Sequence, residues 1–422
     1  MEVIKIKKWS FGVDNDELLE LVLDGKKVAT SCLYENCELP VIGEESIIEF
    51  SNEKEACIVK TVDYKIMKFN EMTEELAKLE GEGDLSLDYW RKVHLKFFKS
   101  IKPEFSEEDK IIFEIFQITK NLVEERLELA KKIANQNLEI FGKIDSIEEV
   151  NSGFRNTLFN INNKYIIKVC TNKEMEESFR IEYDFYVSNK DNPFIPKFYK
   201  YDDSKKDCEF VYEIIEKIEG KTLYYYWYKM SENEREETIK KLIDIIKTFH
   251  LVKTESFDWE DKIENEIKKR IERSKDVFDT DDYSMIIKSI EKYKDYFVDN
   301  RFALLHNDLH FDNIIYNNGG LKIIDFNDSM SAPIDFEFRL LYMCQYKPWK
   351  WANVDMDPYQ KPEDYKNIWN YIKKYYKELA EIKNLEQRMI IYSIWDDSKH
   401  LKEYREKELI TNIVENSKKL LQ

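Results

Sequence analysis

The spacing of hydrophobic positions changes twice along this 422-residue chain, which predicts three stretches of different structure. In residues 1–120 short alternating runs are mixed with helical ones, and we expect strands over 45–50, 56–62 and 111–118. The next stretch, 121–138, has helical spacing, charged faces and neither Gly nor Pro. This pattern is typical of a helix that connects two domains.

From about residue 140 the pattern predicts a small lobe of strands and then a lobe of helices. Strands are expected over 144–150, 157–161, 165–169 and 207–215, with a helix over 173–188. After Gly220 nearly everything is expected to be helical, apart from one hairpin near 314–324. A β-rich lobe followed by a helical lobe is the layout of a nucleotide kinase. The expected organisation is therefore α+β, with a first domain at 1–120, a connecting helix at 121–139, a kinase N-lobe at 140–220 and a kinase C-lobe at 221–422.

Composition excludes several classes of function. Aromatic residues make up 14% of the chain, while Gly and Pro number only 10 and 8, so packed cores and long helices are expected. The net charge of −18 argues against nucleic-acid binding through a broad basic field, but not against a local basic pocket. The six cysteines include no Cys-x-x-Cys pair, which favours free thiols in a reducing cytoplasm. Because no signal core and no apolar run of ~20 residues is found, we expect a cytoplasmic protein with no membrane partner.

A segment near residue 310 has the side chains that phosphoryl transfer requires. That reaction needs a carboxylate to orient and deprotonate a hydroxyl, together with ligands that hold Mg²⁺ against the phosphates. An apolar strand leads into the spacing His306-x-Asp308-x-x-x-x-Asn313, and Asp325 follows the next pair of apolar strands. The spacing indicates a catalytic loop in which Asp308 is the base.

The hairpin after this loop predicts a metal site. Its apolar strands flank the turn Asn317-Asn-Gly-Gly320, and centring the hairpin on Gly319 places Asn313 opposite Asp325. A carboxamide oxygen and a carboxylate oxygen at one point suit Mg²⁺. Asp308 is five residues before Asn313 and is expected to face the same point.

The two motifs His306-Asn-Asp-Leu-His-Phe-Asp-Asn313 and Ile324-Asp-Phe326 resemble the aminoglycoside phosphotransferase and choline kinase family. The resemblance covers about residues 140–422. It implies a bilobal protein-kinase-like fold, ATP and Mg²⁺ as cofactors, and a small molecule whose hydroxyl accepts the phosphoryl group. Protein kinases are less similar, because Asp325-Phe-Asn lacks their glycine and no Ala-Pro-Glu segment follows.

The same resemblance implies a role for each residue of the motifs. Asp308 is the base, Asn313 and Asp325 hold Mg²⁺, and His306 braces the loop. Asn307 stands where the antibiotic kinases usually have glycine, and choline and ethanolamine kinases look like this sequence at that position.

The nucleotide-binding residues are expected in the β-rich lobe. Lys168 ends an apolar strand and would reach the α- and β-phosphates, and Glu182 on the following helix could hold it in place. Glu176 and Glu177 compete for that role. Ser152 and the backbone amides of the loop 151–156 could meet phosphate oxygens.

The last strand of the small lobe ends in Glu216-Lys-Ile-Glu-Gly220. In the family that the sequence resembles, this segment is the hinge, and the backbone around Glu216 and Ile218 would meet the adenine.

Acceptor-binding residues are expected after Asp325, where carboxylates would suit an amine-bearing acceptor. The candidates are Asp335, Glu337, Asp396 and Asp397, and aromatic runs over 224–228 and 346–351 could form the walls of a pocket. For both sets, core packing and solvated helix faces are the alternative reading. The sequence does not identify the acceptor.

The first domain has its own motifs. A Gly-Lys-Lys-x-x-Thr start at Gly25 and a Glu-Gly-Glu-Gly-Asp run at Glu80, followed by Tyr-Trp, resemble the ASCH domain, a small β-barrel of the PUA-like type. The resemblance implies an RNA or nucleotide ligand. In one branch of that family a Lys, a Thr and a Glu hydrolyse acylated cytidine, and Lys27, Thr30 and Glu80 stand at those positions.

The chemistry of these three residues suits such a reaction, with Glu80 as base, Lys27 as oxyanion partner and Thr30 as nucleophile or positioner. Because acidic residues outnumber basic ones in residues 1–120, an RNA site would require a local cleft around Lys5, Lys7, Lys26 and Lys27. The alternative is a surface lysine pair in a turn near unrelated acids.

Three readings of the whole chain follow. The first is a small-molecule kinase fused to an RNA- or nucleotide-binding ASCH domain. The second is an inactive kinase-like scaffold whose ASCH domain binds RNA. The third is an enzyme that hydrolyses a modified nucleoside through Lys27 and Glu80.

Overall fold

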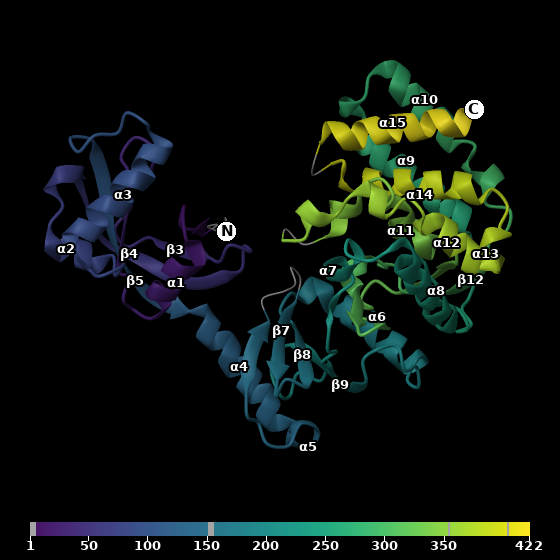
Figure 1. Ribbon diagram of the computed structural model, residues 1–422, viewed down its shortest axis with the longest axis horizontal. Helices are drawn as coiled ribbons and strands as arrows, with labels where there is room; N and C mark the ends of the chain where they lie inside the picture. The colour runs from purple at the N-terminus through teal and green to yellow at the C-terminus, as the bar shows by residue number, and fades with distance from the viewer. Residues whose placement is uncertain (1–5, 151–155, 353–354, 403–404) are drawn as a thin grey trace. The chain divides into compact units, whose positions relative to one another are not determined.

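The computed structural model describes residues 6–150, 156–352, 355–402 and 405–422 (Figure 1). The chain divides into two compact units, residues 1–135 and 136–422. Among the described residues, every helix is too short or too polar to cross a lipid bilayer.

Unit 1 is a curled five-stranded sheet with helices packed against it (Figure 1). The strand order is β1-β3-β4-β5-β2, in which β1 runs parallel to β3 and the other neighbours are antiparallel. The elements are β1 (Lys7–Trp9), α1 (Asn15–Leu23), β2 (Ala29–Leu33), β3 (Glu45–Glu49), β4 (Glu55–Lys68), α2 (Glu74–Leu79), α3 (Leu87–Ile101), β5 (Lys110–Asn121) and α4 (Leu122–Gln136).

The curl of this sheet comes from its longest strand. The pairing of β4 with β5 shifts register twice, between Ile58 and Val59 and between Thr61 and Asp63. Such irregularities bend a strand and increase its twist. The hydrophobic pattern predicted only residues 56–62 of β4, because the half from Asp63 to Lys68 is largely exposed and has no apolar alternation. The curled sheet places β2 and α3 on two sides of a cavity that is described below.

Unit 2 begins with a second five-stranded sheet, whose order is β6-β7-β8-β10-β9. Its elements are α5 (Leu138–Phe141), β6 (Ile147–Val150), β7 (Thr157–Ile161), β8 (Tyr165–Cys170), α6 (Glu176–Ser188), β9 (Phe198–Asp202) and β10 (Val211–Glu216). The sequence pattern did not predict β9, because all five of its side chains are half-buried and show no alternation. Strand β8 is central and pairs with β7 and β10, which positions Lys168 beside Glu213 of β10.

The rest of unit 2 is mainly helical. Its helices and strands are β11 (Lys221–Thr222), α7 (Tyr224–Trp227), α8 (Glu232–Phe249), α9 (Trp259–Arg273), α10 (Thr280–Ile290), β12 (Phe302–Leu305), β13 (Ile314–Asn317), β14 (Gly320–Ile323), β15 (Met330–Pro333), α11 (Arg339–Met343), α12 (Ile368–Tyr375), α13 (Lys377–Ala380), α14 (Leu385–His400) and α15 (Lys407–Leu421). Short 3₁₀ turns connect several of them. The expectation of a single hairpin after Gly220 was incomplete, because β11 joins that hairpin and β12 pairs with β15.

The register of the β13–β14 hairpin differs from the expected one by one residue. Asn317 pairs with Gly320, so the turn is Asn318-Gly319, and both turn residues have positive φ, 47° and 84°. Two such residues match the right-handed twist of a hairpin. Asn313 therefore lies opposite Ile324, whose N–H donates to the Asn313 carbonyl at 3.0 Å, and Asp325 comes one residue later.

Candidate active site

The backbone of the loop between β12 and β13 is held in place by one buried glutamate. The backbone N–H groups of His306 and Asn307 donate to the carboxylate of Glu337 at 2.8 and 3.0 Å. Burial disfavours the Glu337 carboxylate, but hydrogen bonding and charge from His250, with the hydrogen bond from the backbone of His306, hold its pKa below its usual value. Glu337 is fully buried, so it anchors this loop and does not face an acceptor pocket as the sequence had suggested.

His306 connects the loop to the end of β14. Its Nδ1 accepts from the N–H of Asp308 at 3.1 Å, so Nε2 carries the proton and donates to the carbonyl of Ile324 at 2.9 Å. The imidazole therefore joins the residue before Asp325 to the backbone of Asp308. The two hydrogen bonds hold the loop against the end of β14, and a role for His306 in the reaction stays a prediction.

Asp308 and Asn313 lie in hydrogen-bond contact. The Asn313 side-chain amide donates to the Asp308 carbonyl at 2.9 Å and to Asp308 Oδ2 at 3.2 Å. His310 Nε2 lies 3.4 Å from the same carboxylate oxygen. Burial alone would raise the pKa of Asp308, but the hydrogen bond and charge of His310, with the charge of Arg339, hold it well below its usual value. Asp308 is therefore a carboxylate at neutral pH and able to accept a hydrogen bond from a hydroxyl.

The ammonium group of Lys168 is surrounded by acids. Its Nζ lies 2.5 Å from Glu182 Oε2, 2.9 Å from Asp325 Oδ1 and 3.9 Å from Glu213 Oε1. Burial would lower the pKa of Lys168, yet the charges of Asp325, Glu182 and Glu213 raise it above its ordinary value. Lys168 is therefore charged throughout the physiological range. The partner on the helix is Glu182, whereas Glu176 bonds to Lys205.

Asp325 has a backbone conformation that side-chain-bearing residues rarely adopt, with φ +67°, and Asn307 has the same value. Such conformations cluster at functional sites, where surrounding contacts hold the strain. Oδ1 of Asp325 bonds to Lys168. Among the described residues, no hydrogen bond reaches Oδ2 of Asp325 or Oδ1 of Asn313. The two free oxygens belong to residues at neighbouring positions of the hairpin, because Ile324 lies opposite Asn313 and Asp325 is the next residue.

The remaining nucleotide-site predictions are placed as follows. Glu216 ends β10, and its Oε2 accepts the backbone N–H of Lys197 at 3.0 Å. Lys217 donates its backbone N–H to Lys164 at 2.9 Å. Among the described residues, the backbone of Ile218 makes no hydrogen bond, so it is available to a ligand. Ser152 and most of its loop lie outside the described residues.

Most of the residues that the sequence offered as acceptor ligands are instead engaged within the protein. Asp335 is fully buried and accepts two hydrogen bonds from Arg388, both at 2.7 Å, and one from Tyr392 at 2.8 Å. Asp396 and Asp397 lie 2.6 and 3.5 Å from the ammonium of Lys350. In the aromatic run 224–228, Tyr224 and Trp227 belong to the core. Asp335 therefore fits the alternative reading of core packing, because the buried Arg388 pairs with its carboxylate.

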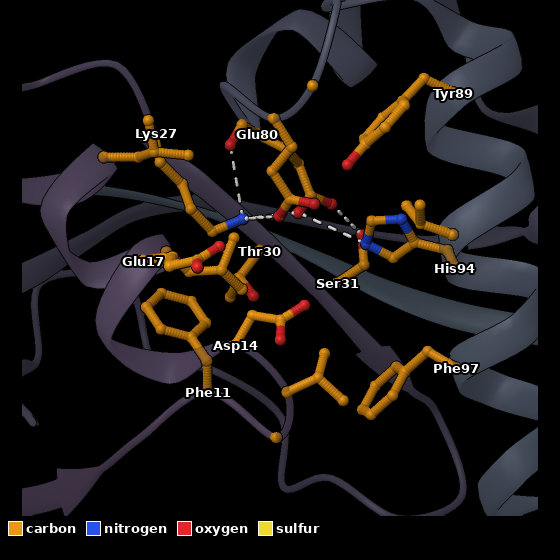
Figure 2. Close-up of a pocket in the computed structure, with 17 residues that line it drawn as sticks. Phe11, Asp14, Glu17, Lys27, Thr30, Ser31, Glu80, Tyr89, His94 and Phe97 are labelled. Atoms are coloured by element: carbon orange, nitrogen blue, oxygen red, sulfur yellow. Dashed lines mark hydrogen bonds and ion pairs between the residues drawn. The ribbon is translucent and has the colours of Figure 1, made fainter. Parts of the chain in front are cut away.

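A second set of candidate residues lies in unit 1, in a cavity of about 240 Å³ (Figure 2). Lys27 and Glu80 are each 1% exposed, and Lys27 Nζ lies 2.8 Å from Glu80 Oε2 and 2.6 Å from Glu82 Oε1. Thr30 lines the same cavity. The reading of Lys26 and Lys27 as a surface pair was wrong, since only Lys26 reaches solvent.

Glu80 receives more donors than a general base should have. Its carboxylate accepts from Lys27, from Ser31 Oγ at 2.6 Å and from Trp90 Nε1 at 2.9 Å, and His94 Nε2 is 3.5 Å away. Burial opposes its charge, but Lys27 and His94 overcome this and hold the pKa of Glu80 far below its usual value. A carboxylate with such a low pKa is a weak proton acceptor and is better suited to fixing Lys27 and His94. The sequence did not identify Ser31 or Trp90, whose contacts depend on the curl of the sheet.

Of the four lysines expected around a basic RNA-binding cleft, the three that the structure describes each lie against a carboxylate. Lys7 pairs with Glu38 at 3.0 Å, and Lys26 pairs with Asp24 at 2.8 Å. Lys27 is buried between two carboxylates. Lys5 lies outside the described residues.

Comparison with known families agrees with this architecture. The model of the phosphotransferase enzyme family matches residues 146–357, which is half of the chain, and the model of the ASCH domain matches residues 7–120. The chain is thus a phosphotransferase with a separate domain before it. It belongs to the phosphotransferase enzyme family and carries an N-terminal ASCH domain, which confirms both resemblances and the expected fold class.

No curated protein matches the chain. Among solved structures, the GDP complex of a mutant aminoglycoside 2'-phosphotransferase-IIIa is 15% identical, with a TM-score of 0.50, and covers 70% of this chain and 97% of that one. Aminoglycoside phosphotransferase APH(2'')-Ib with ADP is 20% identical, with a TM-score of 0.48, and covers 70% and 96%. An ASCH domain from Lactobacillus crispatus is 25% identical, with a TM-score of 0.27, and covers 28% and 81%. The first of these likenesses supports the kinase-like fold of unit 2.

Proposed function

We propose that unit 2 transfers the γ-phosphate of ATP to a hydroxyl of a small molecule, with Asp308 as the base. The observation that supports this most is the cluster that Lys168 forms with Glu182 and Asp325, close to a loop in which Asn313 contacts Asp308. Cation, metal-ligand candidates and proton acceptor are the groups that phosphoryl transfer requires.

Asn313 and Asp325 are the residues that would hold Mg²⁺. The donor set suits the ion, because it offers a carboxylate oxygen and a carboxamide oxygen that no described residue engages, and Mg²⁺ prefers oxygen ligands. When bound, the ion would neutralise charge on the β- and γ-phosphates. Lys168 would add a fixed positive charge at the α- and β-phosphates, held in place by Glu182.

Asp308 would position the acceptor hydroxyl. Its carboxylate is held by Asn313 and His310 and remains charged at neutral pH. Such a group orients the hydroxyl through a hydrogen bond and receives its proton as the new P–O bond forms. An acceptor with an amine would have to find its carboxylate among groups other than Asp335, which Arg388 occupies.

The proposal places the enzyme in the cytoplasm, where ATP is available. All six cysteines are free thiols, which suits a reducing compartment. The nucleotide itself needs a test, since one solved relative binds ADP and another binds GDP.

The test is a screen for acceptor-stimulated release of nucleoside diphosphate. Amino sugars, amino alcohols, nucleosides and aminoglycosides are each offered with ATP or GTP, with and without Mg²⁺. We expect one class to raise ADP release above the rate without acceptor, and only in the presence of Mg²⁺. Stimulation that persists after chelation of Mg²⁺, or that occurs with GTP alone, would contradict the proposal.

The alternative is an inactive scaffold whose ASCH domain binds RNA or hydrolyses a modified nucleoside, a reaction that would have to use Lys27 and Glu80. Two variants distinguish these readings. Hydrolysis of an acylated nucleoside that Glu80→Gln abolishes and Asp308→Asn leaves intact would favour the alternative. The reverse pattern, acceptor phosphorylation lost only in Asp308→Asn, would favour the kinase.

A further inference from the structure

The ASCH cavity has aromatic side walls and a charged floor (Figure 2). Phe11 precedes α1 on one side, while Tyr89 and Phe97 of α3 are on the other. Lys27 and Glu80 also line the cavity, and because both are buried they form its floor. Walls of this kind fit a small, flat or ring-shaped molecule.

The charges of the cavity are strongly unbalanced. Its lining has four carboxylates against the one ammonium of Lys27. Counting His94 as charged would still leave the lining negative. The acids are Asp14, Glu17, Glu80 and Glu82.

The one lysine of the lining is not available to a ligand anion. Its ammonium is held at 2.8 Å by Glu80 and at 2.6 Å by Glu82, and the side chain is 1% exposed. The pKa of Lys27 is raised, because the two carboxylates outweigh the effect of burial. The charge of Lys27 is thus already balanced by its two carboxylate partners. A phosphate group entering the cavity would meet an excess of negative charge and no free cation.

The carboxylates at the start of α1 have no such partner. Asp14 and Glu17 are exposed, and no lysine or arginine among the described residues pairs with either of them. Both side chains line the cavity together with Phe11 (Figure 2). Carboxylates beside aromatic faces are the surroundings that attract an organic ammonium group.

We propose that this cavity binds a small organic cation, an amine with a ring, through Asp14 and Glu17 and the aromatic walls. The ammonium group lies at the mouth, near the two unpaired carboxylates, and the ring enters between Phe11 and Phe97. Nucleotides and RNA phosphates are excluded from the cavity by its charge. This inference does not depend on the kinase proposal.

A metal ion is a less suitable occupant. Ligand atoms of Glu80, Glu82 and His94 lie within 4.8 Å of one another, so the three could in principle surround a cation. The ammonium of Lys27 already contacts both carboxylates. A metal would have to displace this buried lysine, whereas an organic cation at the mouth displaces nothing.

Three probes with the same ring and different charge test the proposal on the full-length protein. Benzylamine, benzyl alcohol and benzoate are titrated by isothermal calorimetry at low and high salt, with cytidine and cytidine monophosphate as a further pair. We expect benzylamine to bind at least tenfold more tightly than benzyl alcohol. Its affinity should fall as the salt concentration rises. Benzoate and cytidine monophosphate should not bind.

Three variants locate the binding. Glu17→Gln, alone or with Asp14→Asn, should weaken benzylamine several-fold. Glu20→Gln, which removes the same charge from α1 outside the cavity, should change it less than twofold. Equal affinity for the three probes, binding of benzoate or the nucleotide, loss in Glu20→Gln alone, or benzylamine affinity unchanged in the double variant would each overturn the proposal. So would an absence of benzylamine binding at about 10 mM, a concentration that would reveal even weak complexes.

Discussion

Lys168 and Asp325 are 157 positions apart in the sequence, yet Nζ of Lys168 lies 2.9 Å from Oδ1 of Asp325. The lysine stands on β8 of the small lobe, and the aspartate follows β14 of the large lobe. Glu182 on α6 holds the other side of the same ammonium. This contact joins the two lobes of unit 2 at the position where we propose that the phosphates of ATP bind.

Replacing Lys168 should destabilise unit 2 as well as inactivate it. Lys168→Met leaves the buried Glu182 carboxylate without its cation, and removing one partner of a buried ion pair costs about 3–5 kcal/mol. The free energy of unfolding, measured with urea, should fall by that amount. Lys190→Met, on the surface, serves as the control. Equal unfolding midpoints for the two variants would show that the Lys168 cluster does not stabilise the fold.

Asp325→Asn should weaken binding of the Mg²⁺–ATP complex by tenfold or more, because it replaces the only carboxylate of the proposed metal pair. Binding of ATP without Mg²⁺ should change much less. Calorimetric titrations with and without the metal measure both quantities, and Asp244→Asn on an exposed face of α8 is the matched control. A similar loss with and without Mg²⁺ would argue that Asp325 acts on the nucleotide through Lys168 alone.

The ASCH domain should lose stability in acid through Glu80. The pKa of this carboxyl is lowered on folding from an ordinary value of 4.5, so its contribution is fully present above that pH and is lost as the pH falls below it. In Glu80→Gln that contribution is absent at every pH. Thermal unfolding between about pH 3 and 7 should therefore show a shallower acid limb in the variant. If the unfolding temperature fell equally steeply with pH in the wild type and in Glu80→Gln, the assigned pKa shift would be contradicted.

Asp335→Asn should act on folding and not on acceptor affinity. The carboxylate is buried against Arg388, which would lose its charged partner, so we expect a loss of about 3–5 kcal/mol in stability. The KM for an identified acceptor, measured at a temperature where the variant is folded, should stay within twofold. A tenfold rise in KM without loss of stability would instead indicate that Asp335 contacts the acceptor.

The sequence predicted that the residues of this loop come together, because they are close in the chain and their motif is specific. His306, Asp308 and Asn313 lie within eight positions, and strand polarity then placed Asp325 nearby. The one-residue error in the hairpin arose because the turn Asn317-Asn-Gly-Gly offers two possible centres, and only the positive φ of Asn318 and Gly319 selects between them.

Contacts between distant segments were harder to predict. Local sequence shows that Asp335 and Glu337 are acids in an apolar stretch, but Arg388 and the backbone of His306, which satisfy them, come from elsewhere in the chain. The burial of Lys27 likewise depends on the segment that contains Glu80 and on helix α3, neither of which adjoins it in sequence. From sequence alone, polar residues of this kind are predicted to be exposed, because the partners that allow their burial cannot be seen.

The most direct test of the central claim separates binding from chemistry in Asp308→Asn. Affinity for Mg²⁺–ATP, measured by calorimetry, should remain within twofold of the wild-type value. Turnover with an active acceptor should fall by about 10²–10⁴-fold, the usual contribution of a general base, while Asp244→Asn retains full turnover. Wild-type turnover in Asp308→Asn would contradict the assignment of Asp308 as the base that receives the acceptor's proton.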